Sequence, residues 1–146
     1  MRARLRRFRS LIEGPADLWL LCRMGAWAAV LPVLKRVVRL ETLARIMWSE
    51  REARSEVDAD KIFTLSHLLT QRPPRSTERC YERSLIAYRF LSQRGADPRL
   101  VAAVKKEGGS IAGHAWVTVG GTALGESGAV ADFVPVVVYG RGGRRT

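Results

Sequence analysis

Cysteine and histidine, the side chains best suited to nucleophilic chemistry near neutral pH, are scarce in this chain, which has two of each. Cys80 follows Ser76-Thr77, residue types that commonly cap helices, and with Thr77 as the cap it falls at the third helical position. Free backbone N–H groups and the helix dipole at that position favour the thiolate, the nucleophilic form of cysteine. Arg79 and Arg83 add positive charge nearby. The spacing predicts a reactive thiol, with a small buried structural cysteine as the alternative.

His114 is the candidate general base. It opens the predicted strand 114–119 directly after the glycine-rich stretch 108–113. A histidine at a loop-to-strand junction is exposed on one side, and the glycines allow a peptide backbone to come close. The other histidine, His67, and the other cysteine, Cys22, lie in apolar helical patterns and are predicted to be structural.

A histidine base needs a third group that fixes its tautomer, and Glu126 and Asp132 are the candidate acids. A three-residue loop at Val119–Gly121 would place Glu126 opposite His114 in an antiparallel hairpin. A two-residue Gly120-Gly121 turn, which Gly-Gly suits well, would turn Glu126 to the other face. We favour the three-residue loop because it supplies the partner that the mechanism needs, and Asp132 is the fallback acid.

The elements that must position these residues change character at Pro73-Pro74. Apolar residues recur at helical spacing before this pair, and alternating or β-branched runs dominate after it. Helices followed by antiparallel strands indicate an α+β fold, with a helical region at 1–74 packing on a core at 75–146. The expected elements are helices within 18–34, 34–48, 62–69 and 79–94, the last ended by Gly95, and strands at 100–105, 114–119, 122–126 and 133–139.

The charge of the chain is concentrated at its ends. The 146 residues carry a net charge of +11, of which eight arginines at 2–9 and 141–145 account for all but +3. We expect two short, frayed basic arms in solvent, with docking to an acidic partner or an anionic membrane surface as the alternative. No basic face with interleaved aromatic residues is present, which argues against a nucleic-acid partner.

One apolar segment, 18–34, follows the basic start in the manner of a targeting sequence. Glu13 and Asp17 precede it, Arg23 interrupts it and Pro32 falls near its end, all of which disfavour that interpretation. We predict a buried helix, with peripheral membrane contact as the alternative.

The number and spacing of the cysteines indicate which metal sites the chain can form and in which cellular compartment it is found. Two cysteines in different contexts cannot form a disulfide framework, and no CxxC or Cys/His cluster supplies ligands for structural zinc. The sequence therefore predicts a cytoplasmic protein without a metal or cofactor.

A resemblance to a known family rests on two stretches, RCYERSLIAYRFLSQRGADPRLVAAVKK and AGHAWVTVGGTALGE. Their matching elements are Cys80 followed by Arg83-Ser84-Leu85, the helix-ending Gly95, and His-Ala-Trp-Val with a glycine turn. Residues 75–130 resemble the lasso-peptide leader peptidases, the B proteins of lasso-peptide biosynthesis, in the split form whose leader-binding module is a separate chain.

The resemblance implies a transglutaminase-like, papain-related fold and a cysteine protease that removes the leader from a ribosomally made precursor. In that mechanism Cys80 attacks, His114 shuttles the proton, and the position of Glu126 supplies the acid. The implied partners are the precursor leader, a separate leader-binding protein and an ATP-dependent lasso cyclase. Two positions depart from the family pattern: Thr118 stands where the family often has Glu, and Glu126 stands where it usually has Asp.

Two alternatives remain open at the level of sequence. One is another transglutaminase-like acyl transfer to a different amine acceptor. The other is a non-catalytic, membrane-associated adaptor, which the basic arms and the helical first half would suit.

Overall fold

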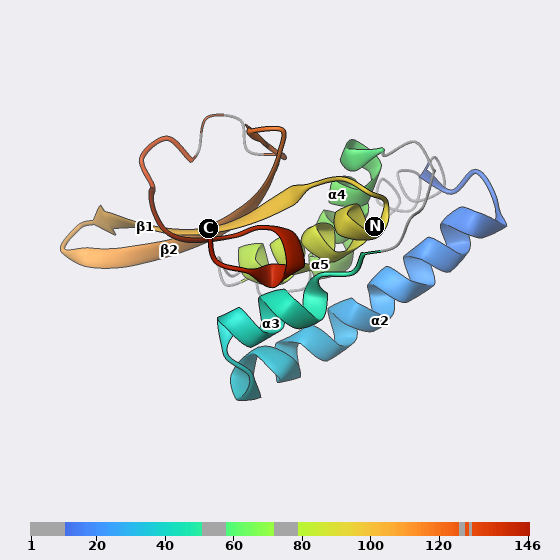
Figure 1. Cartoon of the computed structure of the whole chain (residues 1–146), viewed down its shortest axis with the longest axis horizontal. Coiled ribbons are helices and arrows are strands. Elements are labelled where there is room, and N and C mark those ends of the chain that lie inside the picture. Colours follow the sequence, from blue (N-terminus) through green and yellow to red (C-terminus); the bar gives the residue numbers. More distant parts are fainter. Residues whose placement is uncertain (1–10, 51–57, 72–78, 126–127, 129) are drawn as a thin grey trace.

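The computed structural model describes residues 11–50, 58–71, 79–125, 128 and 130–146. The described chain is four α-helices followed by a four-stranded antiparallel sheet and a short 3-10 turn (Figure 1). This is the α+β fold that the sequence predicts. The Pro73-Pro74 boundary, the Ser76-Thr77 cap, Glu126 and the N-terminal arm lie outside the described residues.

Helices α2 (Pro15–Val37) and α3 (Leu40–Met47) divide an apolar pattern that the sequence shows as continuous. Gly14 and Pro15 begin α2, as expected from a proline at the first helical turn. Val38 and Arg39 both adopt extended backbone conformations, so α2 ends there and α3 starts in a new direction. In Figure 1, α3 folds back beside the C-terminal end of α2.

Helix α5 (Arg79–Gln93) is the centre of the molecule, and it contacts α2, α3, α4 (Ala59–Thr70), β1 and β2. Its predicted end is confirmed: Gly95 has a φ of +80°, and the Ala96 N–H donates to the Leu91 carbonyl at 3.2 Å. This is the left-handed glycine termination that satisfies the last carbonyls of a helix.

The sheet has the strand order β3-β2-β1-β4. Strands β1 (Pro98–Glu107) and β2 (Ser110–Val119) pair along their whole length and form the long hairpin that projects beyond the helices in Figure 1. Strand β3 (Thr122–Ala123) pairs with the last two residues of β2. On the other side of β1, β4 (Val134–Tyr139) carries a bulge, because Ala102 pairs with Val137 and Ala103 with Pro135.

The turn between β2 and β3 corrects the predicted register. Val119 pairs with Thr122 and Thr118 with Ala123, so the loop is the two-residue Gly120-Gly121 turn and not the three-residue loop. Both glycines have φ in the left-handed region, at +58° and +83°. That conformation matches the twist of the two strands and is open to glycine at no steric cost, so local turn chemistry decided the register.

One hydrophobic core joins the helical region to the sheet. It contains residues of α2, α3, α4, α5, β1, β2 and β4, among them Met24, Leu31, Leu43, Ile62, Leu91, Leu100, Val117 and Tyr139. A smaller cluster on the other face of the sheet centres on Val101, Ala103 and Trp116. Residues of the helices and of the sheet thus share one core, and the division of the chain at residue 74 stays a prediction.

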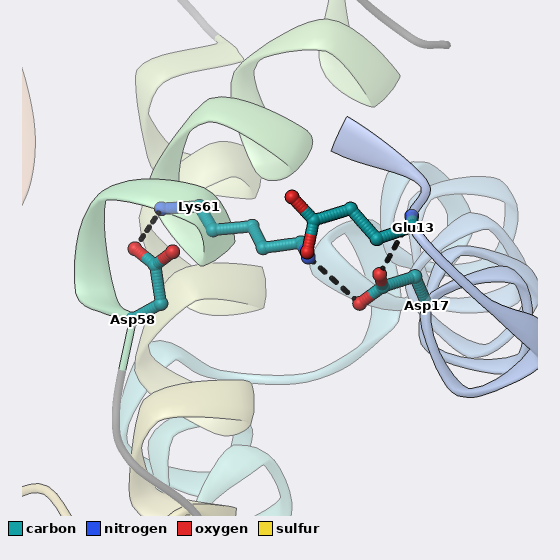
Figure 2. Close-up of polar contacts among 4 residues, drawn as sticks. All are labelled: Glu13, Asp17, Asp58 and Lys61. Carbon is teal, nitrogen blue, oxygen red and sulfur yellow. Dashed lines mark hydrogen bonds and ion pairs between the residues drawn. The ribbon is translucent and has the colours of Figure 1, made fainter. Parts of the chain in front are cut away.

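Polar contacts fasten α2 to its neighbours along its length. Arg23 donates to the Gln93 side chain at 2.9 Å, and Lys35 pairs with Glu82 at 2.8 Å, both on α5. Figure 2 shows the third contact, in which Lys61 of α4 reaches Asp17 at 2.8 Å. The other Asp17 oxygen accepts from the Glu13 N–H, and Asp58 caps α4 by accepting from the Lys61 N–H (Figure 2).

The C-terminal basic segment is folded, which corrects the prediction of a frayed arm at this end. Tyr139 forms a bridge with Arg145, and the Thr146 N–H donates to the Val138 carbonyl at 2.9 Å. Gly143 is buried with a φ of +67°, and a Cβ there would lie 2.5 Å from the backbone of Arg45 on α3. The segment therefore closes over α3 through a contact that only glycine permits.

Candidate active site

Cys80 lies in the first turn of α5, with its side chain partly exposed. It lines a groove of about 790 Å³ whose walls come from α3, α5, β1, β2, β4 and the turn before β4. The end of a buried helix gives the thiol a fixed position while leaving it accessible. Cys22, in contrast, is exposed on α2 and does not line this groove.

Ser84 connects the Cys80 turn of α5 to β2. Its buried hydroxyl lies 2.7 Å from the Cys80 carbonyl oxygen and 3.0 Å from that of Ala115, and its proton is shared between these two acceptors. Ala115 directly follows His114 in β2. The hydroxyl thus holds the helix that carries the candidate nucleophile against the strand that carries the candidate base.

His114 lies in the middle of β2, which corrects the prediction that it stands at a loop-to-strand junction. The hairpin turn uses only Gly108-Gly109, so Ser110 to Gly113 pair with β1 and extend the strand before His114. Alternation along the strand places His114 on the same face as Trp116. Its ring centroid is 5.9 Å from that of Trp116 and 5.2 Å from that of Phe133.

Cys80 and His114 are both among the residues that line the groove. Cys80 enters from the helical layer. His114 belongs to the sheet, and its ring contacts those of Trp116 and Phe133. Lys105 also lines the groove; its ammonium lies 5.1 Å from the centroid of the Phe133 ring and 3.4 Å from the Glu107 carboxylate.

The third member of the predicted set, Glu126, lies outside the described residues. The register argument that favoured it is wrong, because the Gly120-Gly121 turn does not place it opposite His114. Gly125, the last described residue before Glu126, lies so close to Phe63 that a Cβ would be 1.9 Å from the ring. Arg83 of α5 lies over the same ring, 5.3 Å from its centroid.

Asp132, the fallback acid, is exposed in the turn before β4. It is adjacent to Phe133, whose ring packs on His114. Both candidate acids therefore remain predictions.

The two arginines that were expected to add positive charge near Cys80 are held by α4. Arg79 donates to the Thr70 carbonyl at 3.2 Å, and an Arg83 nitrogen lies 3.1 Å from His67 Nδ1. The guanidinium can only donate, so Nδ1 accepts and this ring nitrogen carries no proton. His67 thus serves in packing α4 against α5, the structural role predicted for it.

Several groove residues have no signal in the sequence. Leu40, Tyr81, Ile111 and Val136 come from four different elements, and only the tertiary fold gathers them. Burial raises the pKa of Tyr81, so this phenol stays protonated. Phe133 is different, because it begins the β-branched run that the sequence singles out as a strand. The bulge in β4 at Val136 bends this edge beside the groove.

Within the described residues, no group of three or more His, Cys, Asp or Glu side chains lies close enough together to hold a metal ion. Besides its apolar residues, the groove is lined by the Cys80 thiol, the His114 imidazole, the Tyr81 phenol and the charged residues Lys105 and Glu107. Residues 20–138 match the family model described as the transglutaminase-like superfamily. No curated protein and no solved structure gives a significant match.

Proposed function

The chain belongs to the transglutaminase-like superfamily, and on this premise we propose that it is a cysteine peptidase that removes the leader from a ribosomally synthesised lasso-peptide precursor before macrolactam closure. The observation that supports the proposal is the shared groove, which is lined both by Cys80, in the first turn of a buried helix, and by His114, on β2. The motifs around these two residues are the ones that resemble the lasso-peptide leader peptidases.

In the proposed mechanism the Cys80 thiolate attacks the scissile carbonyl carbon, and His114 first accepts the thiol proton. The tetrahedral oxyanion is stabilised by backbone N–H groups at the start of α5, for which the Cys80 N–H is our candidate. His114 then protonates the leaving amine, and the C–N bond breaks to give a thioester. Water, deprotonated by His114, hydrolyses the thioester and restores the thiol.

The groove suits a peptide better than a small polar substrate. Its wall is formed by aliphatic and aromatic side chains of three strands and two helices. Ile111 and Val136 expose apolar surface at its edge, which an extended peptide can cover. The scissile bond would lie where Cys80 and His114 face the groove.

The first test is cleavage of a precursor peptide by the wild-type chain and by Cys80→Ala, with products identified by mass spectrometry. Loss of the nucleophile should reduce turnover by about three orders of magnitude or more while leaving the fold intact. Cys22→Ala is the matched control, because Cys22 is exposed and outside the groove. A thiol alkylator should inactivate the enzyme and a chelator should not. Full cleavage by Cys80→Ala would end the proposal.

The same assay separates hydrolysis from the alternative acyl transfer. Hydrolysis leaves a free carboxylate on the leader fragment, whereas transfer to an added amine gives a conjugate of higher mass. A dominant conjugate at modest amine concentration would identify the chain as an acyl transferase.

The identity of the acid is tested by comparing Glu126→Gln with Asp132→Asn. We propose that Glu126 orients His114, so its amide should lower turnover roughly 10²–10⁴-fold, as loss of the orienting acid does in related triads. Asp132→Asn should stay near wild type. The reverse outcome would assign the acid to Asp132.

We also propose that substrate capture depends on a separate leader-binding protein and that the product passes to the ATP-dependent cyclase. Adding the leader-binding protein should lower the apparent KM for full-length precursor with little change in kcat. A precursor without its leader-binding segment should show no such effect. Equal KM values with and without that protein would contradict the split arrangement.

A further inference from the structure

The outer side of α2 is an apolar stripe that nothing in the described chain covers. At helical spacing it exposes large and small apolar side chains and one cysteine: Leu18, Trp19, Cys22, Ala26, Ala29, Val30, Val33 and Val37. Trp19 is 67% exposed, Val33 65% and Val37 76%. The stripe continues for the length of the helix, which exceeds the scattered exposure of single apolar residues on ordinary surfaces.

The charges of α2 are turned toward the protein or lie at the helix ends. Arg23, the charge inside the apolar run, is held by the Gln93 side chain and lies 5.5 Å from the Phe90 ring. Asp17 and Lys35 are paired with residues of α4 and α5. The outer side is therefore uncharged from Leu18 to Val33.

These same contacts decide how α2 can meet a bilayer. By length and composition α2 could cross a membrane, and it is the one helix of the described residues that could. Crossing would break the Asp17, Arg23 and Lys35 contacts and expose the buried residues Met24 and Leu31. A helix that lies in the interface keeps all of these contacts and the burial of Met24 and Leu31, because only the outer stripe enters the lipid.

Along the sequence, basic residues flank the stripe at both ends. Five arginines fall within residues 2–9 of the sequence, and Arg36 and Arg39 are exposed just beyond Val33. An uncharged stripe between two basic ends complements a bilayer whose surface is anionic and whose interior is apolar. Trp19 is the residue type that favours the level of the lipid headgroups.

The alternatives fit less well. A second copy would bring together two chains of net charge +11 along a stripe with arginines at both ends, and these would repel. A protein partner would find few hydrogen-bonding side chains on the stripe, whereas protein interfaces carry about one hydrogen bond per 100–200 Å².

We propose that the outer stripe of α2 docks the protein on the surface of an anionic phospholipid bilayer, with α2 lying in the plane of the interface. This surface is separate from the groove and does not depend on the proposed peptidase activity. It would hold the enzyme at the membrane with the groove facing the aqueous phase.

The test uses the full chain as Cys80→Ala, so that Cys22 is the one thiol and lies within the stripe. An environment-sensitive fluorophore on Cys22 should shift to the blue when vesicles of equal parts phosphatidylglycerol and phosphatidylcholine are added. Pure phosphatidylcholine vesicles should bind more weakly, and raising the salt concentration should release the protein. Alkaline carbonate should also release it, because α2 does not cross the bilayer.

Variants locate the surface without a label, by co-sedimentation with the anionic vesicles. Val33→Glu should lower partitioning about tenfold or more, because a charge replaces an apolar side chain in the stripe. Ser110→Glu is the matched control: it adds the same charge at an exposed site on the far hairpin and should bind as wild type. Arg36→Gln and Arg39→Gln should each weaken binding about fivefold, as expected from about 1 kcal/mol per basic residue at an anionic surface.

Circular dichroism of each variant should show that the variant is folded like the wild type. Wild-type protein that stays in solution with anionic vesicles, or Val33→Glu that binds as wild type, would overturn the proposal. A blue shift without vesicles, accompanied by dimers in analytical ultracentrifugation, would assign the stripe to a second copy. Retention after carbonate treatment would show that α2 spans the bilayer instead.

Discussion

Helices α5 and α2 each carry one of the two cysteines, but they occupy opposite kinds of environment. Ten of the fifteen residues of α5 are buried, against four of the twenty-three of α2. Helix α5 is enclosed by three helices and two strands, whereas α2 packs along one side and leaves the other open. A sequence prediction of a buried helix at 18–34 therefore holds for one face of α2 only.

This difference in burial indicates which helix can hold a catalytic residue and which can provide a docking surface. A nucleophile needs a position fixed by packing, and the first turn of α5 supplies it at the edge of a groove. A docking surface needs apolar area that folding leaves uncovered, and α2 supplies it without touching the groove. Cys80 and Cys22 have the same chemistry, so the different roles that we propose for them rest on the environments of the helices that carry them.

The largest expected effect on stability comes from replacing an aliphatic residue by alanine on α5, which can be compared with the same kind of replacement on α2. Leu91→Ala removes a fully buried side chain of α5 and should lower the free energy of unfolding by about 2–5 kcal/mol. Val33→Ala removes an exposed side chain of α2 and should change it by less than about 0.5 kcal/mol. Urea unfolding followed by circular dichroism measures both. Equal losses would mean that the outer face of α2 is covered in solution.

The comparison also shows how far the sequence predicts this fold. The end of α5 was predictable because its signal is local: Gly95 stops the helix through its own backbone freedom. The boundary between the first two helices was predicted too early, at residue 34. Helix α2 continues through Pro32 to Val37, because Val37 and Val38 keep the apolar spacing of a helix, and the break falls at the extended pair Val38 and Arg39, from which α3 packs back on α2.

For the candidate site, residue types were predictable and geometry was not. Cys80 and His114 stand out because each type is scarce, and both reach the groove. The predicted pairing of Glu126 with His114 is wrong because it was chosen to suit the mechanism. The preference of two adjacent glycines for left-handed backbone conformations favours the two-residue turn instead. Tyr81 and Leu40 could not be found, since the pattern that places them in the groove exists only in three dimensions.

The ion pair between the two helices gives the second prediction. Glu82 is buried in α5, and Lys35 of α2 lies 2.8 Å away. Lys35→Met leaves that carboxylate without its cation and should cost about 1–3 kcal/mol, less than a fully buried pair because Lys35 is partly exposed. Adding Glu82→Gln to the same chain should recover part of the loss. A double variant that is no better than Lys35→Met would show that the pair does not couple the helices.

The third prediction concerns Ser84, which fastens α5 to β2 at the groove. Ser84→Ala removes a hydroxyl shared between two carbonyl oxygens and should cost about 1 kcal/mol of stability. If the hydroxyl sets the position of Cys80 relative to His114, kcat should also fall about tenfold with KM unchanged. Ser92→Ala is the matched control at the far end of α5, where the hydroxyl donates to Arg89 and accepts from the Ser49 N–H. It should lose similar stability and keep its kcat.

The smallest expected effect is the pH dependence of the contact between α2 and α4. The pKa of Asp17 lies below its ordinary value of 3.8. The hydrogen bond from Lys61 is the largest cause, and the hydrogen bond from the Glu13 N–H is the next. A depressed carboxyl pKa means that the folded state favours the ionised form. The contact therefore stabilises the fold above about pH 4 and loses its contribution as the pH falls through the folded pKa.

Asp17→Asn should thus lower the free energy of unfolding by about 0.5–1 kcal/mol at neutral pH, the usual value for a pair near the surface. The difference between this variant and the wild type should shrink to zero in more acidic solution, below the pKa of the folded carboxyl. Lys61→Met should abolish most of the effect of Asp17→Asn, because the two groups act through one contact (Figure 2). Denaturant titrations of the wild type, the two single variants and the double variant, at several acidic pH values, measure this coupling. A difference that persists when Asp17 is protonated would mean that the side chain fastens α2 to α4 by shape, and not by its charge.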